Sequence, residues 1–423
     1  MEEILIVLNE WWETKSISGE KAKDYERKAF SRIRETFFGY RQILVLNGLR
    51  RVGKTTIMFQ LIGELLKKDT SPRHILYFSF DEAVENPLAV LEAYSKITKI
   101  DWKKERIFLF FDEIQKLKDW SSKIKILYDN FPNLKICISG SASLMIKKEA
   151  IGDLAGRYFS EYIPPLTLQE FAELSFGKTV ENFELHELDL KRIFDDYARK
   201  PFPEIVKWDD RAKVNSYIRE LVIEKIIKSD VPEAFENVNS ALLSSLTEIF
   251  MKDVGMILDV TSLSKELGVH KLTLMKHIGF LEFGNLFRVV KNFRPSIRAE
   301  SRKLKKIYPA HISLAFCFYP KLAGGQIYEC LVCSALNLKR YWREGRKEID
   351  FLMTGDKTTP IEVKEKDSIN KKDVKNLLIF LKKYDLHEGI VVYSGKEGRL
   401  AMKGKTIVLQ PIQKLLFCPT PAD

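Results

Sequence analysis

The chain has 423 residues, of which 45% are hydrophobic, and its formal net charge at pH 7 is +11; this length and composition suggest two to four domains with ordinary hydrophobic cores. No apolar run approaches the length of a membrane span, and Glu2 and Glu3 stand where a signal peptide needs positive charge, so we expect a cytoplasmic protein with no membrane partner. The five cysteines, an odd number, give no disulfide framework, and we expect buried, reduced thiols.

Residues 1–40 are expected to form a helical lead-in. An apolar strand at residues 43–46 then precedes the sequence G-L-R-R-V-G-K-T-T at residues 48–56, which fits the pattern G-x-x-x-x-G-K-[ST] and is followed by an amphipathic helix. In such a loop the backbone N–H groups surround the β-phosphate, Lys54 neutralises phosphate charge and Thr55 offers a hydroxyl to Mg²⁺. The sequence therefore predicts a site for ATP and Mg²⁺ formed by Gly48, Arg51, Val52, Gly53, Lys54, Thr55 and Thr56.

A second apolar strand, residues 106–111, ends in Asp112 and Glu113. An Asp at a strand tip can hold Mg²⁺, and a carboxylate one residue later is placed to polarise a water molecule. Two acids after a strand could also simply begin a helix, where the dipole favours negative charge. Beside a phosphate-binding loop, we interpret Asp112 as a metal ligand and Glu113 as the general base of hydrolysis.

Two further strands, residues 74–80 and 135–141, are expected to complete a parallel α/β sheet. Ser139 or Ser141 would then lie at a strand tip facing the γ-phosphate, although serine before glycine is also ordinary turn chemistry. Arg157 is either a solvated side chain or a catalytic group that contacts the γ-phosphate of its own or a neighbouring subunit. The neighbouring-subunit alternative implies a homo-oligomer.

The positive net charge indicates an acidic partner, and nucleic acid is the leading candidate, although a lysine-rich surface can also simply serve solubility. In residues 288–306 the only acid is Glu300. The basic residues of this segment are Arg288, Lys291, Arg294, Arg298, Arg302, Lys303, Lys305 and Lys306.

This basic segment follows a helix-turn-helix candidate at residues 259–281. Its first helix, with a serine or threonine cap, is expected to end at Gly268, and a basic wing is expected to begin at Phe287. The second helix is expected to bury Leu272, Met275, Ile278 and Leu281. Winged helices bind DNA but also serve as protein-contact modules, and both interpretations stay open.

The last hundred residues contain a predicted hairpin whose strands are residues 348–353 and 359–364. Alternate residues of a strand share one face, so Glu362 and Lys364 point the same way, and Asp350 lies in the same region. Two carboxylates can hold Mg²⁺ while the lysine orients or deprotonates the attacking water of a phosphodiester cleavage. Glu329, on a preceding helix, would add a metal-binding carboxylate. An exposed hairpin with paired Glu and Lys is the alternative.

With a helix before it, and a helix at residues 371–383 and a strand at residues 389–393 after it, this hairpin resembles the PD-(D/E)XK nuclease superfamily, which also includes inactive folds. The whole chain resembles archaeal-type P-loop ATPases of the AAA+/STAND grouping that carry a winged helix and a C-terminal nuclease-like domain. His311 stands where such proteins commonly have an acid. The resemblance rests on the loop at residues 48–56, F-D-E-I-Q at 111–115, S-G-S at 139–141, L-A-G-R at 154–157, P-L-T-L-Q-E-F at 165–171 and P-F-P-E at 201–204.

The resemblance implies an α/β protein in which ATP hydrolysis is coupled to an unidentified action on DNA or mobile elements. We expect a helical lead-in, a P-loop ATPase core, a helical lid or connector, a winged helix and a nuclease-like domain, in residues 1–40, 41–165, 166–238, 239–320 and 321–423. Two functions compete: an ATPase that gates a metal-dependent nuclease, and an ATP-switched regulator whose C-terminal fold only binds DNA or protein.

Overall fold

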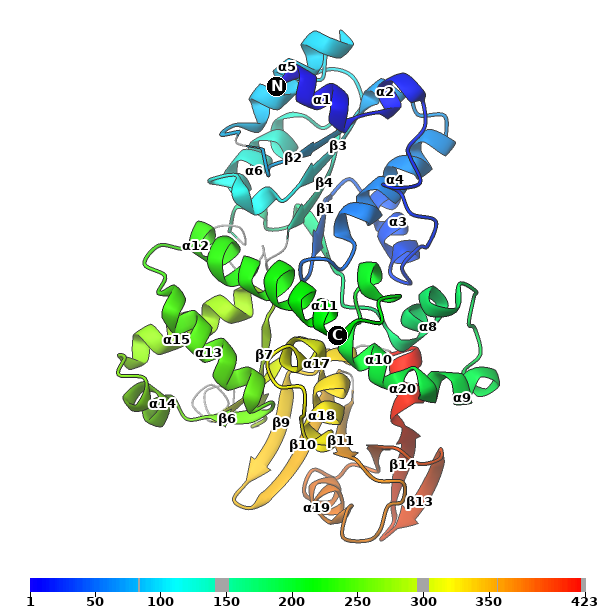
Figure 1. The fold of residues 1–423 in the computed structure, drawn as a ribbon, viewed down its shortest axis with the longest axis vertical. Helices are drawn as coiled ribbons and strands as arrows, with labels where there is room; N and C mark the ends of the chain where they lie inside the picture. The colour runs from blue at the N-terminus through cyan, green and yellow to red at the C-terminus, as the bar shows by residue number, and fades with distance from the viewer. Residues whose placement is uncertain (83, 141–151, 295–303, 356, 420–423) are drawn as a thin grey trace. The chain divides into compact units, whose positions relative to one another are not determined.

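The computed structural model describes residues 1–423 except 83, 141–151, 295–303, 356 and 420–423 (Figure 1). The chain divides into two compact units. The first unit comprises Met1–Pro164, Lys228–Asn237 and Phe283–Asn285, and the second comprises Pro165–Ile227, Val238–Glu282 and Leu286–Asp423.

The first unit contains a five-stranded sheet in the order β2-β3-β4-β1-β5, in which every neighbouring pair is parallel (Figure 1). Its strands are β1 (Ile43–Asn47), β2 (Ile75–Ser79), β3 (Ile107–Asp112), β4 (Leu134–Gly140) and β5 (Tyr158–Tyr162). The predicted parallel α/β sheet is confirmed. Because the strands run parallel, their carboxyl ends meet at one edge, where α/β proteins place their ligands.

Strands β1 to β4 of this sheet are mostly buried and largely apolar, as expected where helices cover a parallel sheet, whereas the edge strand β5 is not. All of residues 43–46 in β1 are fully buried. The helices α3 (Phe30–Gly39), α4 (Lys54–Lys67), α5 (Pro87–Thr98) and α6 (Trp120–Asn130) and the 3₁₀ turns η1 (Pro72–His74) and η2 (Ile114–Lys116) connect the strands or precede them. Helix α5 shows why such segments begin where they do: Asn86 accepts a hydrogen bond from the Leu88 N–H, and proline occupies the first helical position.

The amino-terminal helices α1 (Glu2–Leu8) and α2 (Trp11–Thr14) cover the edge strand β2. The Asn9 side chain donates to the Tyr77 carbonyl at 2.9 Å and accepts from the Tyr77 N–H at 2.7 Å. The indole N–H groups of Trp11 and Trp12 both donate to the Ile75 carbonyl, at 3.1 and 2.8 Å. The predicted lead-in thus pairs backbone groups that an edge strand would otherwise expose.

Lys135 is a buried cation at the amino end of β4, and its ammonium donates to the carbonyls of Tyr40 and Gln42, each at 2.7 Å. Burial lowers the pKa of Lys135 to about 8. An unfolded chain holds this proton up to about pH 10.4, so between these values the unfolded state binds more protons and the free energy of unfolding should rise with pH. We expect Lys135→Met to remove that rise. Urea unfolding of both proteins between pH 7.5 and 10.5 measures it, and parallel stability curves would contradict this assignment.

The second unit contains a nine-stranded sheet in the order β13-β14-β12-β11-β10-β9-β7-β8-β6. Its strands are β6 (Met256–Leu258), β7 (Phe287–Asn292), β8 (Lys305–Pro309), β9 (Arg340–Glu344), β10 (Lys347–Thr354), β11 (Thr358–Lys364), β12 (Glu388–Tyr393), β13 (Gly398–Met402) and β14 (Lys405–Pro411). Strands β7 and β9 pair in parallel, with Lys291 opposite Arg340 and Asn292 opposite Tyr341. This pairing joins residues before and after the expected domain boundary at position 320 in one sheet.

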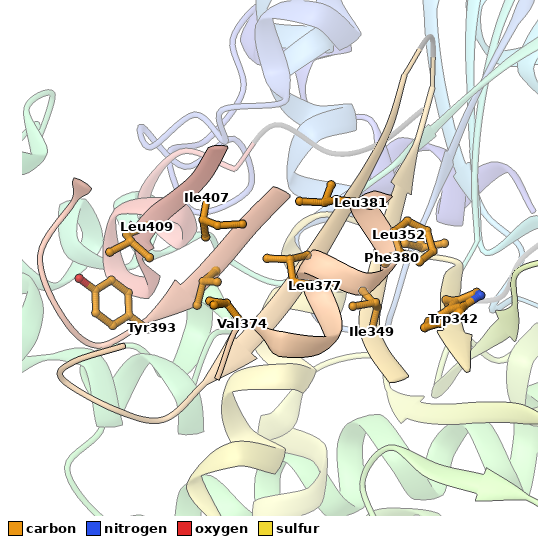
Figure 2. Close-up of a cluster of buried hydrophobic side chains, with 11 residues drawn as sticks. Trp342, Ile349, Leu352, Val374, Leu377, Phe380, Leu381, Tyr393, Ile407 and Leu409 are labelled. Atoms are coloured by element: carbon orange, nitrogen blue, oxygen red, sulfur yellow. The ribbon is translucent and has the colours of Figure 1, made fainter. Parts of the chain in front are cut away.

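The carboxyl-terminal half of this sheet packs against helix α19 (Lys375–Lys383), as Figure 2 shows. Leu377, Phe380 and Leu381 of the helix meet Trp342 and other buried side chains of the strands. The packing is close, because a Cβ added at Gly389 of β12 would lie 2.9 Å from a methyl group of Leu377. Helices α18 (Gly324–Ala335) and α20 (Ile412–Phe417) also contact strands of this sheet.

The segment expected as a lid or connector is helical in the structure. It contains α8 (Leu168–Phe176), α9 (Phe183–Arg192), α10 (Phe194–Arg199), η4 (Pro203–Ile205), α11 (Arg211–Ser216), η5 (Tyr217–Glu224), η6 (Ile226–Asp230) and α12 (Val231–Ala234). Helix α8 begins with a capping box, since Thr167 accepts from the Glu170 N–H and Glu170 accepts from the Thr167 N–H. The segments η5 and η6 are π-helical, a conformation that is rare in proteins.

Residues 239–320 form, in order, α13 (Ser240–Lys252), β6, α14 (Val260–Glu266), α15 (Lys271–Phe283), β7, β8 and α17 (Ile312–Phe316). The cap of α14 is Asp259, which accepts from two backbone N–H groups, and not a serine or threonine. The expected buried stripe of α15 is wrong in two places: Leu272 is 75% exposed and Met275 is 36% exposed.

The reason for this difference is the orientation of α15. Leu274, Ile278 and Leu281 are buried, and their spacing of four and three residues defines one helical face. Leu272 lies on a different face. His277, also buried, accepts a hydrogen bond from the Asn239 N–H at 2.9 Å, which ties α15 to the start of α13.

The sequence analysis expected buried thiols and no membrane-spanning segment. Cys137, Cys330 and Cys333 are buried free thiols, whereas Cys418 is exposed, so the expectation of burial is wrong for that residue. Within the part of the chain that the structure describes, the helices are too short or too polar to cross a bilayer.

Candidate functional site

The phosphate-binding loop predicted from the sequence lies between the end of β1 and the start of α4. Gly48 and Gly53 have φ angles of 146° and 97°, which favour glycine. A Cβ at Gly48 would lie 2.3 Å from the Ile163 carbonyl oxygen, so only glycine fits there. The loop leads directly into the first turn of α4, and a helix N-terminus with free N–H groups is a natural anion site.

Lys54, the first residue of α4, is buried, and its ammonium donates to the carbonyls of Gly48 at 3.1 Å and Leu49 at 2.8 Å. Burial lowers the pKa of Lys54, and the negative charges of Glu113 and Asp112 oppose that effect. A lysine ammonium has three donors, and two of them here serve the loop's own backbone. The cation is therefore already held at the loop that would receive a phosphate.

Asp112, at the tip of β3, is the acceptor of several side-chain hydrogen bonds. Its carboxylate accepts from the Thr55 hydroxyl at 2.6 Å, from the Tyr77 hydroxyl at 3.0 Å and from the Ser139 hydroxyl. Burial, followed by the Asp112 charge, raises the pKa of Tyr77, which keeps that hydroxyl protonated as a donor. The structure thus brings together the two predicted metal ligands, Thr55 and Asp112, and their oxygens are of the type that Mg²⁺ prefers.

The role expected for Ser139 changes with this geometry. Its hydroxyl donates a hydrogen bond to the Asp112 carboxylate and not toward a phosphate, so Ser139 orients the predicted metal ligand. Ser141, the other serine considered, lies outside the described residues.

Glu113 follows Asp112 directly and has a left-handed backbone conformation, with φ of 49°. Its carboxylate accepts a hydrogen bond from the Gln115 side chain. Burial raises the pKa of Glu113, while Lys54 and Arg50 act in the opposite direction. The predicted base therefore lies at the same edge of the sheet as the loop and Lys54.

Sequence reasoning missed Arg50, which belongs to the loop but matches none of its consensus positions. Its guanidinium donates to both carboxylate oxygens of Asp230, at 2.9 and 2.6 Å, and lies 3.9 Å from the Glu113 carboxylate. Burial alone would lower the pKa of Arg50, but the hydrogen bonds and charge of Asp230 outweigh it and raise the pKa. The partner is 180 residues away, and no local pattern could have indicated it.

Arg157 is not placed to contact a phosphate bound in its own subunit. Its carbonyl accepts from the Ile43 N–H at 2.8 Å, and its guanidinium binds the Asp129 carboxylate at 2.7 and 3.0 Å. Ile43 begins β1, whereas the loop follows the end of β1, five residues on. At about 3.3 Å per residue, roughly 16 Å separates the two edges of the sheet. The expected contact of Arg157 with a phosphate in its own subunit is thus wrong, and its contact with a neighbouring subunit stays a prediction.

A second group of charged side chains lies at the predicted hairpin of β10 and β11, which the structure confirms. The Lys364 ammonium donates to Glu362 at 2.6 Å and lies 3.6 Å from the Asp350 carboxylate. Asp350 also accepts from the Val363 N–H at 2.8 Å. Glu362 is only 3% exposed, and burial, together with the Asp350 charge, raises its pKa well above the usual range. The three residues are together, as the sequence predicted.

Glu329, on α18, is near this group but has partners of its own. It accepts from the Tyr308 hydroxyl at 2.7 Å and lies 3.9 Å from the Lys306 ammonium. Burial and the charge of Asp350 raise its pKa. In the described part of the chain, no set of three or more His, Cys, Asp or Glu side chains is arranged to hold a metal ion. The metal site expected from Glu329, Asp350 and Glu362 stays a prediction.

The basic side chains of residues 288–306 are not all exposed. Lys306 is buried and binds Glu348 at 2.6 Å, so its expected contact with DNA is wrong. Arg294 donates to the carbonyl of Arg343 at 2.7 Å. Lys291 is exposed. Arg298, Arg302 and Lys303 lie outside the described residues.

His311, which replaces a common acid, has a structural place in this fold. It is buried at the start of α17, and its ring accepts from the Ser313 N–H at 3.1 Å. Burial lowers the pKa of His311 to about 3, so the ring is neutral at physiological pH. It therefore caps a helix and carries no charge.

Comparison with known protein families gives a match at the first site. Residues 40–172 match the family model described as an AAA domain. This part of the chain is thus similar to ATPase-like AAA domains. Residues 195–320 and 324–415 match two families described only as domains of unknown function.

Two relatives from Methanocaldococcus jannaschii are uncharacterized proteins. One, MJ1637, is 30% identical over 61% of this chain and 55% of its own length; the other, MJ1544, is 27% identical over 76% of this chain and 74% of its own length. The chain thus spans about half the length of the first relative. A solved structure, the Walker-type ATPase PABY2304 of Pyrococcus abyssi, aligns with 72% of this chain and 99% of its own, at 14% identity and a TM-score of 0.43.

Proposed function

We propose that the first unit binds ATP together with Mg²⁺ and hydrolyses it. The observation that carries this proposal is the gathering of Lys54, Thr55, Asp112 and Glu113 at the carboxyl edge of one parallel sheet. The loop backbone and Lys54 bind the phosphates, Thr55 and Asp112 hold the metal, and Glu113 accepts the proton of the attacking water. Mg²⁺, when bound, offsets the charge of the phosphate oxygens.

Release of phosphate from ATP by the purified full-length chain tests this proposal. Turnover should require Mg²⁺ and stop with a chelator, because Asp112 and Thr55 offer oxygen ligands suited to that ion. A wild-type chain that neither binds nor hydrolyses ATP in the presence of Mg²⁺ would overturn it.

We further propose that ATP hydrolysis is coupled to DNA binding and to metal-dependent DNA cleavage by the second unit. Support comes from the net charge of +11, from exposed Lys271 and Lys276 on α15, and from the meeting of Asp350, Glu362 and Lys364. The helix order of residues 239–320 is the one expected of a winged helix.

The alternative function is an ATP-switched regulator that contacts a protein. The observation favouring it is that α15 exposes Leu272 and Met275 beside its lysines. Apolar side chains on an exposed helical face suit a protein partner better than a phosphate backbone.

The salt dependence of DNA binding separates these two functions. Each phosphate that a lysine neutralises contributes about 0.9 to the slope of log affinity against log salt, so Lys271→Gln with Lys276→Gln should flatten the slope by about two. Fluorescence anisotropy with a labelled duplex between 50 and 200 mM salt, as a rough working range, measures it. Lys396→Gln with Lys403→Gln, exposed lysines elsewhere in the second unit, is the control. An unchanged slope in the first variant would exclude α15 as the DNA site.

A further inference from the structure

We propose that Arg50 is a catalytic residue whose guanidinium contacts the γ-phosphate of ATP during hydrolysis, and that Asp230 is the positioning residue that holds Arg50 before ATP binds. The proposal rests on the proposed ATPase function. The sequence analysis considered Arg157 for contact with the γ-phosphate, but Arg157 lies at the opposite edge of the sheet. The proposal gives this contact to Arg50, a residue of the loop itself.

Arg50 lies close to the place where the γ-phosphate must bind. It lies two residues after Gly48 in the loop that wraps the phosphates, and its guanidinium is 3.9 Å from the Glu113 carboxylate. A water held by Glu113 would lie about 2.8 Å from that carboxylate and about 3 to 3.5 Å from the phosphorus that it attacks. The γ-phosphate must therefore bind within roughly 6 Å of Glu113, which is the neighbourhood that Arg50 already occupies.

The chemistry of the step explains the use of a guanidinium. The water oxygen forms a bond to the γ-phosphorus, the bond from that phosphorus to the bridging oxygen breaks, its electron pair stays on ADP, and Glu113 takes the water proton. Negative charge is spread over the γ-phosphate oxygens in the transition state. A planar, always charged arginine with parallel N–H donors suits these oxygens better than a solvated lysine does.

Asp230 is what Arg50 binds in this structure. Its side chain is 1% exposed and accepts from two nitrogens of the guanidinium. The bidentate pair fixes Arg50 beside Glu113, whose carboxylate lies at the longer distance of 3.9 Å. An arriving γ-phosphate must compete with Asp230 for the same donors, so the carboxylate holds the side chain in place at a cost in ATP affinity.

Asp230→Asn tests the holding role. The amide has no charge to compete with phosphate, so ATP affinity should increase by about threefold to tenfold, and turnover should stay within about threefold of wild type. A residue with only a structural role would weaken ATP binding when changed. Weaker binding or a large loss of turnover in Asp230→Asn would overturn the role assigned to Asp230.

The double variant Arg50→Ala with Asp230→Asn tests the catalytic role. The single change Arg50→Ala would leave a buried carboxylate without its guanidinium and endanger folding, whereas asparagine removes that charge. Relative to Asp230→Asn, the double variant should lose about 10²- to 10³-fold in kcat, while its ATP affinity should fall by less than about tenfold. Free guanidinium ion added to the double variant should restore part of the turnover.

The matched control is Arg32→Ala with Glu161→Gln, which removes an arginine–carboxylate pair of 2.7 Å elsewhere in the same unit. It should leave kcat and ATP affinity as in wild type. A double variant at positions 50 and 230 with kcat within about threefold of Asp230→Asn would overturn the proposal for Arg50 alone. A wild-type chain without ATP turnover would instead overturn the proposed function on which it rests.

Discussion

Replacing Glu113 with glutamine is expected to slow ATP hydrolysis by about 10²-fold or more while ATP binding is retained. Glutamine keeps the shape of the side chain and its contact with Gln115 but cannot accept the proton of the attacking water. Fluorescent-nucleotide binding and phosphate release, measured on the same preparation, give the two quantities. Equal turnover in wild type and Glu113→Gln would show that Glu113 is not the base.

Lys54→Ala provides the contrasting phenotype. This ammonium is held at the loop by two backbone carbonyls, so its loss removes phosphate contacts in the ground state and in the transition state. ATP binding itself should weaken. Lys54→Ala should weaken ATP binding, whereas Glu113→Gln should keep it. This contrast distinguishes a residue that binds phosphate from a general base, which loss of activity alone does not.

The pH dependence of kcat gives an independent check on Glu113. Its burial raises the pKa of the carboxyl group above the usual glutamate value of about 4.3. The base must be deprotonated, so kcat should rise with pH through this raised pKa and level off above it. The remaining slow turnover of Glu113→Gln should lack that acid limb.

The nucleotide site was predictable because its signals are local. The loop needs glycine at two positions where φ is positive, and the buried strands before Gly48 and Asp112 read as unbroken apolar runs. The hairpin of β10 and β11 was likewise predictable, since strand alternation alone places Glu362 and Lys364 on one face.

The wrong or missing predictions have a different cause. They depend on the direction of a strand or on contacts between residues far apart in the sequence. Arg157 precedes a strand that runs parallel to β1, and strand direction decides which edge a residue occupies. The number of basic residues in its segment predicted that Lys306 is exposed, but Lys306 is buried and forms an ion pair with Glu348. The contact of Arg50 with Asp230 joins positions that no sequence window contains.

The pairing of β7 with β9 has a practical consequence. Residues 286–320 and 321–423 share one sheet, so cutting the chain at position 320 would expose the edge of β9. Experiments on the C-terminal carboxylates are therefore best made with the full-length chain.

In that chain, Asp350→Ala or Glu362→Ala is expected to abolish Mn²⁺ binding at the second unit and any DNA cleavage. Lys364→Ala should spare metal binding and lose cleavage. The structure gives the reason: Lys364 is now the cation that offsets the repulsion between the two acids, and a metal ion must take over that role before the lysine can act on a water. ATPase activity should survive all three changes, because none of these residues belongs to the first unit.

Calorimetric titration of Mn²⁺ without nucleotide, together with cleavage of labelled duplex, single-stranded and branched DNA, measures both effects. Glu365→Ala is the matched control, since this exposed carboxylate is next to Lys364 and outside the cluster. The ion pair between Lys364 and Glu362 makes the test informative in both directions. If Lys364 merely neutralises a buried pair of acids, its removal should tighten Mn²⁺ binding in a chain that never cuts DNA. A wild type that binds no Mn²⁺ at this unit and cleaves no DNA with or without ATP would rule out the nuclease, and the regulator would take its place.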